Sequence, residues 1–165
     1  MTDEHYSIPN PHVRVTLNGI CNLVDIDGVF VTAGQPSEDH LHELATHGFE
    51  AVVNLGLLDP RYCLSDEAAS VATLGMFYHH IPVNFQNPTS ADFDRFREVM
   101  NSLRGKVVFA HCAMNYRVSC FTALLGEAEL GWSRAQADAY IGRVWEPNEV
   151  WNRFLARVRS EFTEV

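Results

Sequence analysis

Long apolar runs and basic residues are both scarce in this chain of 165 residues. No apolar run approaches the roughly 18 residues that a membrane-spanning helix needs, so no transmembrane segment is expected. Residues 1–5 form an acidic start with no apolar run behind it, so a secretory signal peptide is not expected either. The 12 basic residues against 21 acidic ones give a net charge of −9 and form no basic stripe. This argues against a nucleic-acid groove or a surface for anionic membranes, and leaves a small anion site built from backbone N–H groups, where positive potential is local.

Closely spaced cysteine pairs are also absent. The four cysteines, Cys21, Cys63, Cys112 and Cys120, form no C-x-x-C pair and do not follow the spacing of a secreted disulfide framework. We therefore expect reduced thiols in a cytoplasmic protein.

Metal-ligating patterns are missing as well, although the chain has eight histidines. His79 and His80 are adjacent on a predicted strand and therefore point to opposite faces. His40 and His42 are two positions apart on a predicted helix and do not converge. Because no H-x3-H pair or Cys/His pairing occurs, we expect neither a metal nor another cofactor.

Short apolar strands alternate with segments of helical periodicity along the whole chain. Strands are expected at 29–32, 51–55 and 77–83 and from residue 107, and helices at 37–48, 66–74, 89–105, 118–131, 133–144 and 150–158. No linker, repeat or low-complexity segment interrupts the pattern. It predicts one α/β domain over residues 1–165, with an irregular arm at 1–13 and a mostly parallel sheet flanked by helices on both faces. Ligands of such sheets bind at the carboxyl ends of the strands, where the loops 56–62 and 84–88 are expected.

The stretch 107–119 carries the most chemistry. It begins as a buried strand and ends as the start of a helix, with Cys112 and Arg117 between the two. A tight strand-to-helix turn points its N–H groups at one spot, and a guanidinium can clamp an oxyanion bound there. The positive potential of these N–H groups and of the guanidinium also stabilises a thiolate at Cys112. Considered alone, Cys112 would be interpreted as a core residue and Arg117 as a surface residue. Together, with His111 before and Ser119 after, they favour an activated thiolate facing a bound oxyanion.

The chain resembles the cysteine-dependent phosphatase superfamily, and more narrowly the small bacterial phosphatase-like proteins also found as the N-terminal part of beta-lactamase hydrolase-like proteins. The resemblance rests on four motifs: Thr-Ala-Gly-Gln-Pro-Ser at 32–37, Val-Asn-Leu at 53–55, Ile-Pro-Val at 81–83, and His-Cys through Arg-Val-Ser at 111–119.

The resemblance implies a role for each residue of the last motif. Cys112 is the nucleophile that attacks phosphorus, and Arg117 clamps the phosphate. The phosphate-binding loop comprises Ala113, Met114, Asn115, Tyr116 and Arg117. His111 orients this loop and helps to depress the thiol pKa, and the Ser119 hydroxyl assists the departure of the thiolate.

Three features depart from the superfamily pattern. Four residues separate Cys112 from Arg117, where ordinary members have five. The loop contains no glycine, and Asn115 is the residue best able to replace one where φ must be positive. The loop after the 77–83 strand should offer an aspartic acid as proton donor, but this chain has Asn84 there. The nearest carboxylates, at Asp92 and Asp94, lie in the first turn of a helix, where stabilisation of the helix dipole is their better-supported role.

Three functions fit these residues. The first is a phosphatase that hydrolyses phosphate monoesters of a small molecule or a phosphoprotein through a phosphocysteine on Cys112. The second is sulfur transfer through a Cys112 persulfide, because rhodanese-type sulfurtransferases also have the four-residue loop. The third is a non-catalytic domain that binds phosphate or a phosphoprotein.

Two further side chains are open to a functional and a structural interpretation. Cys63 forms a protective disulfide with Cys112 or is an unrelated, partly buried thiol. Tyr116 stacks on a substrate at the rim of the loop or packs on neighbouring residues. The three tryptophans, Trp132, Trp145 and Trp151, are expected to serve helix packing.

Overall fold

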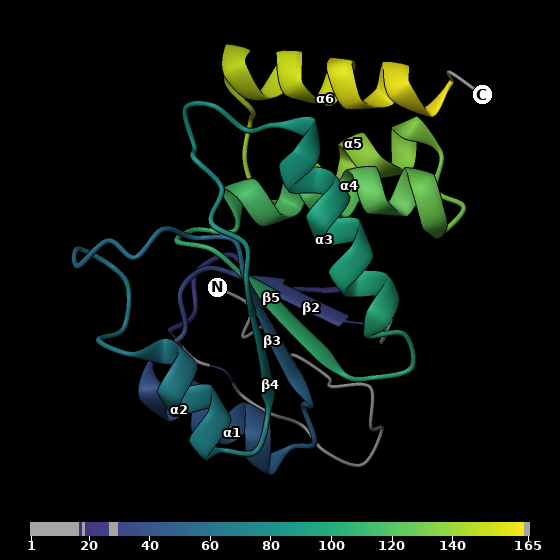
Figure 1. The fold of residues 1–165 in the computed structure, drawn as a ribbon. Coiled ribbons are helices and arrows are strands. Elements are labelled where there is room, and N and C mark those ends of the chain that lie inside the picture. Colours follow the sequence, from purple (N-terminus) through teal and green to yellow (C-terminus); the bar gives the residue numbers. More distant parts are fainter. Residues whose placement is uncertain (1–16, 18, 27–29, 164–165) are drawn as a thin grey trace.

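The computed structural model describes residues 17, 19–26 and 30–163, so the arm predicted at 1–13 lies outside the described residues. Five strands form one sheet in the order β1-β2-β5-β3-β4 (Figure 1). Their bounds are Val24–Ile26 (β1), Phe30–Ala33 (β2), Ala51–Asn54 (β3), Phe77–His80 (β4) and Val108–His111 (β5). Strands β2 to β5 are parallel to one another, whereas β1 runs antiparallel to β2. The predicted α/β class with a mostly parallel sheet is confirmed.

Six helices accompany the sheet in the described part of the chain. They are α1 (Glu38–Thr46), α2 (Glu67–Thr73), α3 (Ser90–Ser102), α4 (Tyr116–Glu129), α5 (Arg134–Gly142) and α6 (Glu149–Phe162). Capping boxes begin α1 at Ser37, α3 at Thr89 and α5 at Ser133. The helix predicted at 133–144 ends at Gly142, earlier than expected.

The helices form two layers, with α1 and α2 on one face of the sheet and α3 to α6 on the other (Figure 1). Alternate strand residues feed the two layers, because successive side chains of a strand point to opposite faces. Val52 and Phe109 pack with the residues of α1 and α2, whereas Val53 and Ala110 pack with the residues of α3 to α6. Strands β2, β3 and β5 are therefore buried on both faces, and functional side chains have room at the strand ends.

Helix α4 is the central helix of the larger layer. Every residue from 117 to 126 is buried, which is the pattern of a helix surrounded by protein on all sides. A side chain at Gly126 would overlap the ring of Trp132, so only glycine fits there. On another side, the Phe121 ring stacks on Phe154 at a centroid distance of 5.4 Å. Close packing of α4 fixes its N-terminus at the carboxyl end of β5.

Two strands differ from their prediction. Strand β1 was not predicted, because its three residues include the polar Asp25 and are too few to show an alternating pattern. Strand β4 was predicted to reach Val83 but ends at His80. The N–H groups of Ile81 and Val83 still donate to the carbonyls of Asn54 and Leu55, at 2.9 and 3.1 Å, so this segment continues alongside β3 without being part of the strand.

Candidate active site

The loop between β5 and α4 lies at the carboxyl end of the central strand. Cys112 opens it, with 1% of its surface exposed, and its N–H donates to the carbonyl of Ala33 at the end of β2. The carbonyl of Ala113 accepts a hydrogen bond of 3.0 Å from the N–H of Gln35. The segment after β2 therefore holds the first half of the loop by backbone contacts.

The structure shows why the Thr-Ala-Gly-Gln-Pro-Ser motif at 32–37 has a glycine at position 34. A Cβ at this position would lie 2.7 Å from the carbonyl oxygen of Ala113 and 3.2 Å from both the Cβ and the carbonyl oxygen of Cys21. Real Cβ contacts are not as close as 2.7 Å, and the blocking atom belongs to the backbone. Only glycine lets the segment after β2 approach the loop this closely.

Asn115 takes the left-handed conformation predicted for the glycine-free loop, with φ of 68°. Its side chain is buried and its Nδ2 donates to the carbonyl of Asn22 at 2.8 Å and to the Thr32 hydroxyl at 3.1 Å. Asn115 also occupies the position before α4 but makes no capping hydrogen bond with its side chain. The N–H groups of the first turn of α4 thus keep their ability to bind an anion.

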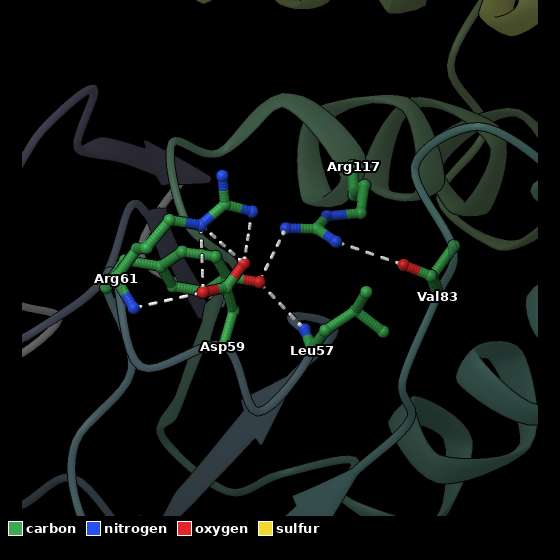
Figure 2. A network of polar contacts seen from close by, with 6 residues as sticks. Leu57, Asp59, Arg61, Val83 and Arg117 are labelled. Atoms are coloured by element: carbon green, nitrogen blue, oxygen red, sulfur yellow. Dashed lines mark hydrogen bonds and ion pairs between the residues drawn. The ribbon is translucent and has the colours of Figure 1, made fainter.

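Arg117 lies in the first turn of α4 and is 6% exposed. Its Nη1 donates to the carbonyl of Val83 at 3.0 Å (Figure 2). Its Nη2 donates to the Tyr62 hydroxyl at 3.5 Å. The guanidinium also lies 5.9 Å from the centroid of the Phe85 ring. The loops predicted near the site, 56–62 and 84–88, both contact this residue, so their predicted placement is confirmed.

Tyr62 is a neighbour of the site that the sequence did not reveal. Its hydroxyl accepts a hydrogen bond of 3.0 Å from the Leu57 N–H in addition to that from Arg117. Its ring lies 3.5 Å from where a Cβ at Gly56 would be, and that point is 3.7 Å from Cα of Cys112. The loop after β3 therefore covers both Cys112 and Arg117.

Asp92 and Asp59, two carboxylates that could be considered as proton donors, both bond to other residues. Asp92 accepts hydrogen bonds from the Thr89 N–H and from Arg95, which matches the predicted role at the helix terminus. The carboxyl group of Asp59, in the loop that covers the site, bonds to Arg61 (Figure 2). Hydrogen bonds from Arg61 lower the pKa of Asp59 to about 2, so this group is ionised at neutral pH and carries no proton to donate.

His111 is fully buried and contacts a carboxylate that the sequence did not single out. Its Nε2 lies 2.7 Å from Oε2 of Glu67, and its Nδ1 lies 3.2 Å from the carbonyl oxygen of Cys112. Glu67 is only 4% exposed, and its Oε1 accepts a hydrogen bond of 2.8 Å from Gln35. The signal that could have found Glu67 is weak, because an acidic residue in the first turn of a helix is usually a solvated partner of the helix dipole.

Ser119 and Tyr116 are both tied to Trp145. The Ser119 hydroxyl donates to the carbonyl of Tyr116 at 2.8 Å and accepts a hydrogen bond of 3.1 Å from the Trp145 indole. The Tyr116 ring stacks on the Trp145 ring at a centroid distance of 4.5 Å. Tyr116 therefore packs on a neighbouring residue, which was one of its two predicted alternatives. The assisting role of Ser119 stays a prediction.

The other cysteines differ in their surroundings. Cys120 is buried in the core, and burial raises the pKa of its thiol to about 12. Cys63 is partly buried, and its N–H donates to the carbonyl of Asp59; its disulfide with Cys112 stays a prediction. Cys21 is exposed and close to the loop, since its carbonyl accepts from the Gly34 N–H at 2.8 Å.

Within the described ranges, no group of three or more histidine, cysteine, aspartate or glutamate side chains is arranged to hold a metal ion. None of the helices in those ranges is long and apolar enough to cross a membrane.

Comparison with known proteins agrees with this geometry. No protein-family profile matches the chain. A crystal structure described as "Putative phosphatase (DUF442)" from Shewanella putrefaciens CN-32 is 30% identical, with a TM-score of 0.78 over 88% of this chain and 96% of that one. P. aeruginosa TpbA, crystallised in complex with pTyr, shares the fold at 15% identity, with a TM-score of 0.66 over 87% of this chain and 91% of that one.

A curated relative extends the comparison to a longer protein. The beta-lactamase hydrolase-like protein of Xylella fastidiosa (strain Temecula1) is 29% identical over 105 residues, which are 62% of this chain and 24% of that protein. The chain thus spans about a quarter of the length of this relative. The resemblance inferred from the sequence motifs is confirmed.

Proposed function

Because the chain belongs to the DUF442 family of phosphatase-like proteins, within the protein tyrosine phosphatase superfamily, we propose that it hydrolyses phosphate monoesters through a phosphocysteine. The observation that carries the proposal is the placement of Cys112 and Arg117. A thiol that is 1% exposed opens a loop whose other end is the N-terminus of α4, with a buried guanidinium in its first turn. Such an arrangement binds a tetrahedral dianion and stabilises a thiolate beside it.

The reaction has two displacements at phosphorus. The Cys112 thiolate attacks the phosphorus atom, the bond from phosphorus to the ester oxygen breaks, and the leaving oxygen takes up a proton from solvent water. Water then attacks the phosphocysteine, which releases inorganic phosphate and restores the thiolate. Arg117 and the loop N–H groups hold the equatorial oxygens, on which negative charge is concentrated during both steps.

The choice of substrate follows from the missing aspartic acid. Asn84 stands at the expected acid position, and the Oδ1 of its side chain accepts a hydrogen bond from the Gln86 N–H at 2.9 Å. An amide cannot donate a catalytic proton, and a general acid contributes about 10² to 10⁴ in rate. Esters with good leaving groups lose least from its absence. Aryl phosphates, the class to which the pTyr bound by TpbA belongs, are therefore the first substrates to test.

The test measures phosphate release from an aryl phosphate under reducing conditions. We expect turnover by the wild type, loss of turnover to background in Cys112→Ser, and a reduction of at least about tenfold in Arg117→Lys, which keeps the charge but not the two-pronged clamp. Cys63→Ser is the matched cysteine control and should retain activity. Turnover that survives in Cys112→Ser would rule out the phosphocysteine.

Sulfur transfer is the second candidate, favoured by the four residues between Cys112 and Arg117. In this reaction the Cys112 thiolate takes the outer sulfur of thiosulfate and sulfite leaves. Cyanide then removes that sulfur from the persulfide as thiocyanate. Thiocyanate formation that depends on Cys112, without phosphate release from aryl esters, would replace the phosphatase assignment.

A non-catalytic anion-binding domain is the third candidate, favoured by Asn84 at the acid position. Vanadate is a suitable probe because it adopts the geometry of a phosphate in transfer. Vanadate binding that is lost in Arg117→Lys, with turnover of neither aryl phosphates nor thiosulfate, would establish this candidate.

A further inference from the structure

The two ring nitrogens of His111 both face hydrogen-bond acceptors. Nδ1 lies 3.2 Å from the carbonyl oxygen of Cys112, and a carbonyl oxygen has no proton to give. Nε2 lies 2.7 Å from the carboxylate of Glu67. If the carboxylate is ionised, each contact requires a proton on the imidazole, and a ring with both protons is a cation.

The surroundings of Glu67 favour its ionised form. Gln35 donates to one carboxylate oxygen and His111 to the other. The Tyr78 hydroxyl forms a further bond to this carboxyl group and itself accepts from the Asn54 amide at 3.1 Å. Burial by itself raises the pKa of Glu67, but the bonds from His111, Gln35 and Tyr78 outweigh burial and leave that pKa below its ordinary value.

We propose that Glu67 is a positioning residue that holds His111 as an imidazolium behind the backbone of Cys112, and that Glu67 thereby supports the stabilisation of the Cys112 thiolate that the family resemblance already implies for His111. Three contacts carry this proposal: Gln35 to Glu67, Glu67 to His111, and His111 to Cys112. The His111 ring lies between the Glu67 carboxylate and Cys112. Cys112 is therefore nearer to the positive member of the Glu67–His111 ion pair than to the negative one. The proposal rests on the proposed function only in taking Cys112 as the reacting thiol.

Other titratable groups near Cys112 do not supply this charge. Burial raises the pKa of Cys120 and Tyr140, and partial desolvation with the nearby Cys112 raises that of Cys21, so these three groups are neutral at pH 7. Arg117 is a separate, buried cation in the first turn of α4, and its Nη1 and Nη2 bond to the Val83 carbonyl and the Tyr62 hydroxyl. His111 and Arg117 therefore have different hydrogen-bond partners, and their charges can be removed separately.

The test compares wild type with Glu67→Gln, which keeps the volume and a hydrogen-bond acceptor but removes the charge. The measured quantity is the rate of Cys112 alkylation by iodoacetamide against pH, followed by mass spectrometry of the peptide that contains Cys112. We expect the midpoint of this profile to move upward by about one pH unit or more in Glu67→Gln. Glu98→Gln, which removes an exposed carboxylate on α3, is the matched control and should leave the midpoint in place. An unchanged midpoint in a folded Glu67→Gln variant would overturn the proposal.

A second measurement needs no variant. The nitrogen chemical shifts of the His111 ring in the wild-type protein at pH 7 report whether one or both nitrogens are protonated. Two protonated nitrogens are expected, and a neutral ring would refute the proposal even if Glu67→Gln failed to fold.

The alkylation profile uses no phosphate ester, so it separates this proposal from the proposed function. A shifted midpoint in a protein that hydrolyses no ester supports the pairing and refutes the phosphatase. Ester hydrolysis with an unshifted midpoint supports the phosphatase and refutes the pairing of Glu67 with His111.

Discussion

Replacement of Asn115 tests how a loop without glycine keeps its shape. Asn115 combines a φ of 68° with two hydrogen bonds from its Nδ2 to Asn22 and Thr32. Asn115→Gly removes the hydrogen bonds but relieves any strain of the left-handed conformation. Asn115→Ala removes the same hydrogen bonds and keeps the strain. The pair of variants therefore separates the two contributions.

The magnitudes follow from the contacts. Two hydrogen bonds contribute about 1 kcal/mol each to the free energy of unfolding. The buried Oδ1 of Asn115 makes no hydrogen bond in the described part of the chain, and its removal returns about 1 kcal/mol. The left-handed conformation costs an alanine about 1 to 2 kcal/mol, whereas glycine loses about 0.5 to 1 kcal/mol through its freer unfolded state. We expect a loss of about 2 kcal/mol for Asn115→Gly and about 2 to 3 kcal/mol for Asn115→Ala.

Urea unfolding at pH 7, followed by fluorescence of the three tryptophans, gives both free energies. Phosphate release from an aryl phosphate shows whether the loop still binds its substrate, and Asn115→Gly should retain more activity than Asn115→Ala. Equal losses of stability and activity in the two variants would refute the argument from the left-handed conformation and leave only the hydrogen bonds.

Three further predictions concern the surroundings of the loop. Tyr62→Phe removes the hydroxyl that contacts Arg117, so we expect vanadate to bind severalfold more weakly by calorimetry, with the free energy of unfolding changed by about 1 kcal/mol or less. Gly34→Ala forces a Cβ against the carbonyl of Ala113, so aryl phosphate turnover should fall by at least about tenfold; turnover at the wild-type level would mean that the segment shifts at little cost. The lowered pKa of Glu67 stabilises the fold above the unfolded pKa of about 4.3, and this contribution disappears as the pH falls through the folded value. The stability gap between wild type and Glu67→Gln in urea should therefore be larger at pH 7 than at pH 3, and a gap independent of pH would contradict the assignment.

The sequence predicted the parts of the site that depend on local geometry. The strand-to-helix junction places the loop from Cys112 to Arg117 at the carboxyl end of the sheet. Because this loop has no glycine, Asn115 was predicted to adopt the positive φ that glycine usually provides. Both follow from residues adjacent in the chain. The loops 56–62 and 84–88 were placed correctly because all parallel strands end at the same edge.

The parts that the sequence did not reveal depend on contacts between distant segments. Glu67 resembles any acidic residue in the first turn of a helix, and only the packing of α2 near the ends of β3 and β5 brings it to His111. Tyr62 lies in a loop without periodicity, so nothing in its neighbours indicates that its hydroxyl reaches Arg117. Strand β1 is too short to be distinguished from a turn until β2 is available to pair with it.

The strand order also sets when the site can form during folding. Strand β5 is inserted between β2 and β3, which precede it by many residues, whereas β3 and β4 are neighbours in both sequence and space. Pairings between distant segments close large loops and form slowly, so we expect β3 and β4 to associate before β5 enters. Until it does, Cys112 has neither Ala33 beside it nor a fixed His111 behind it. Heightened reactivity of this thiol would then be acquired only at the last stage of folding, and its rate of appearance could be used to time the closure of the sheet.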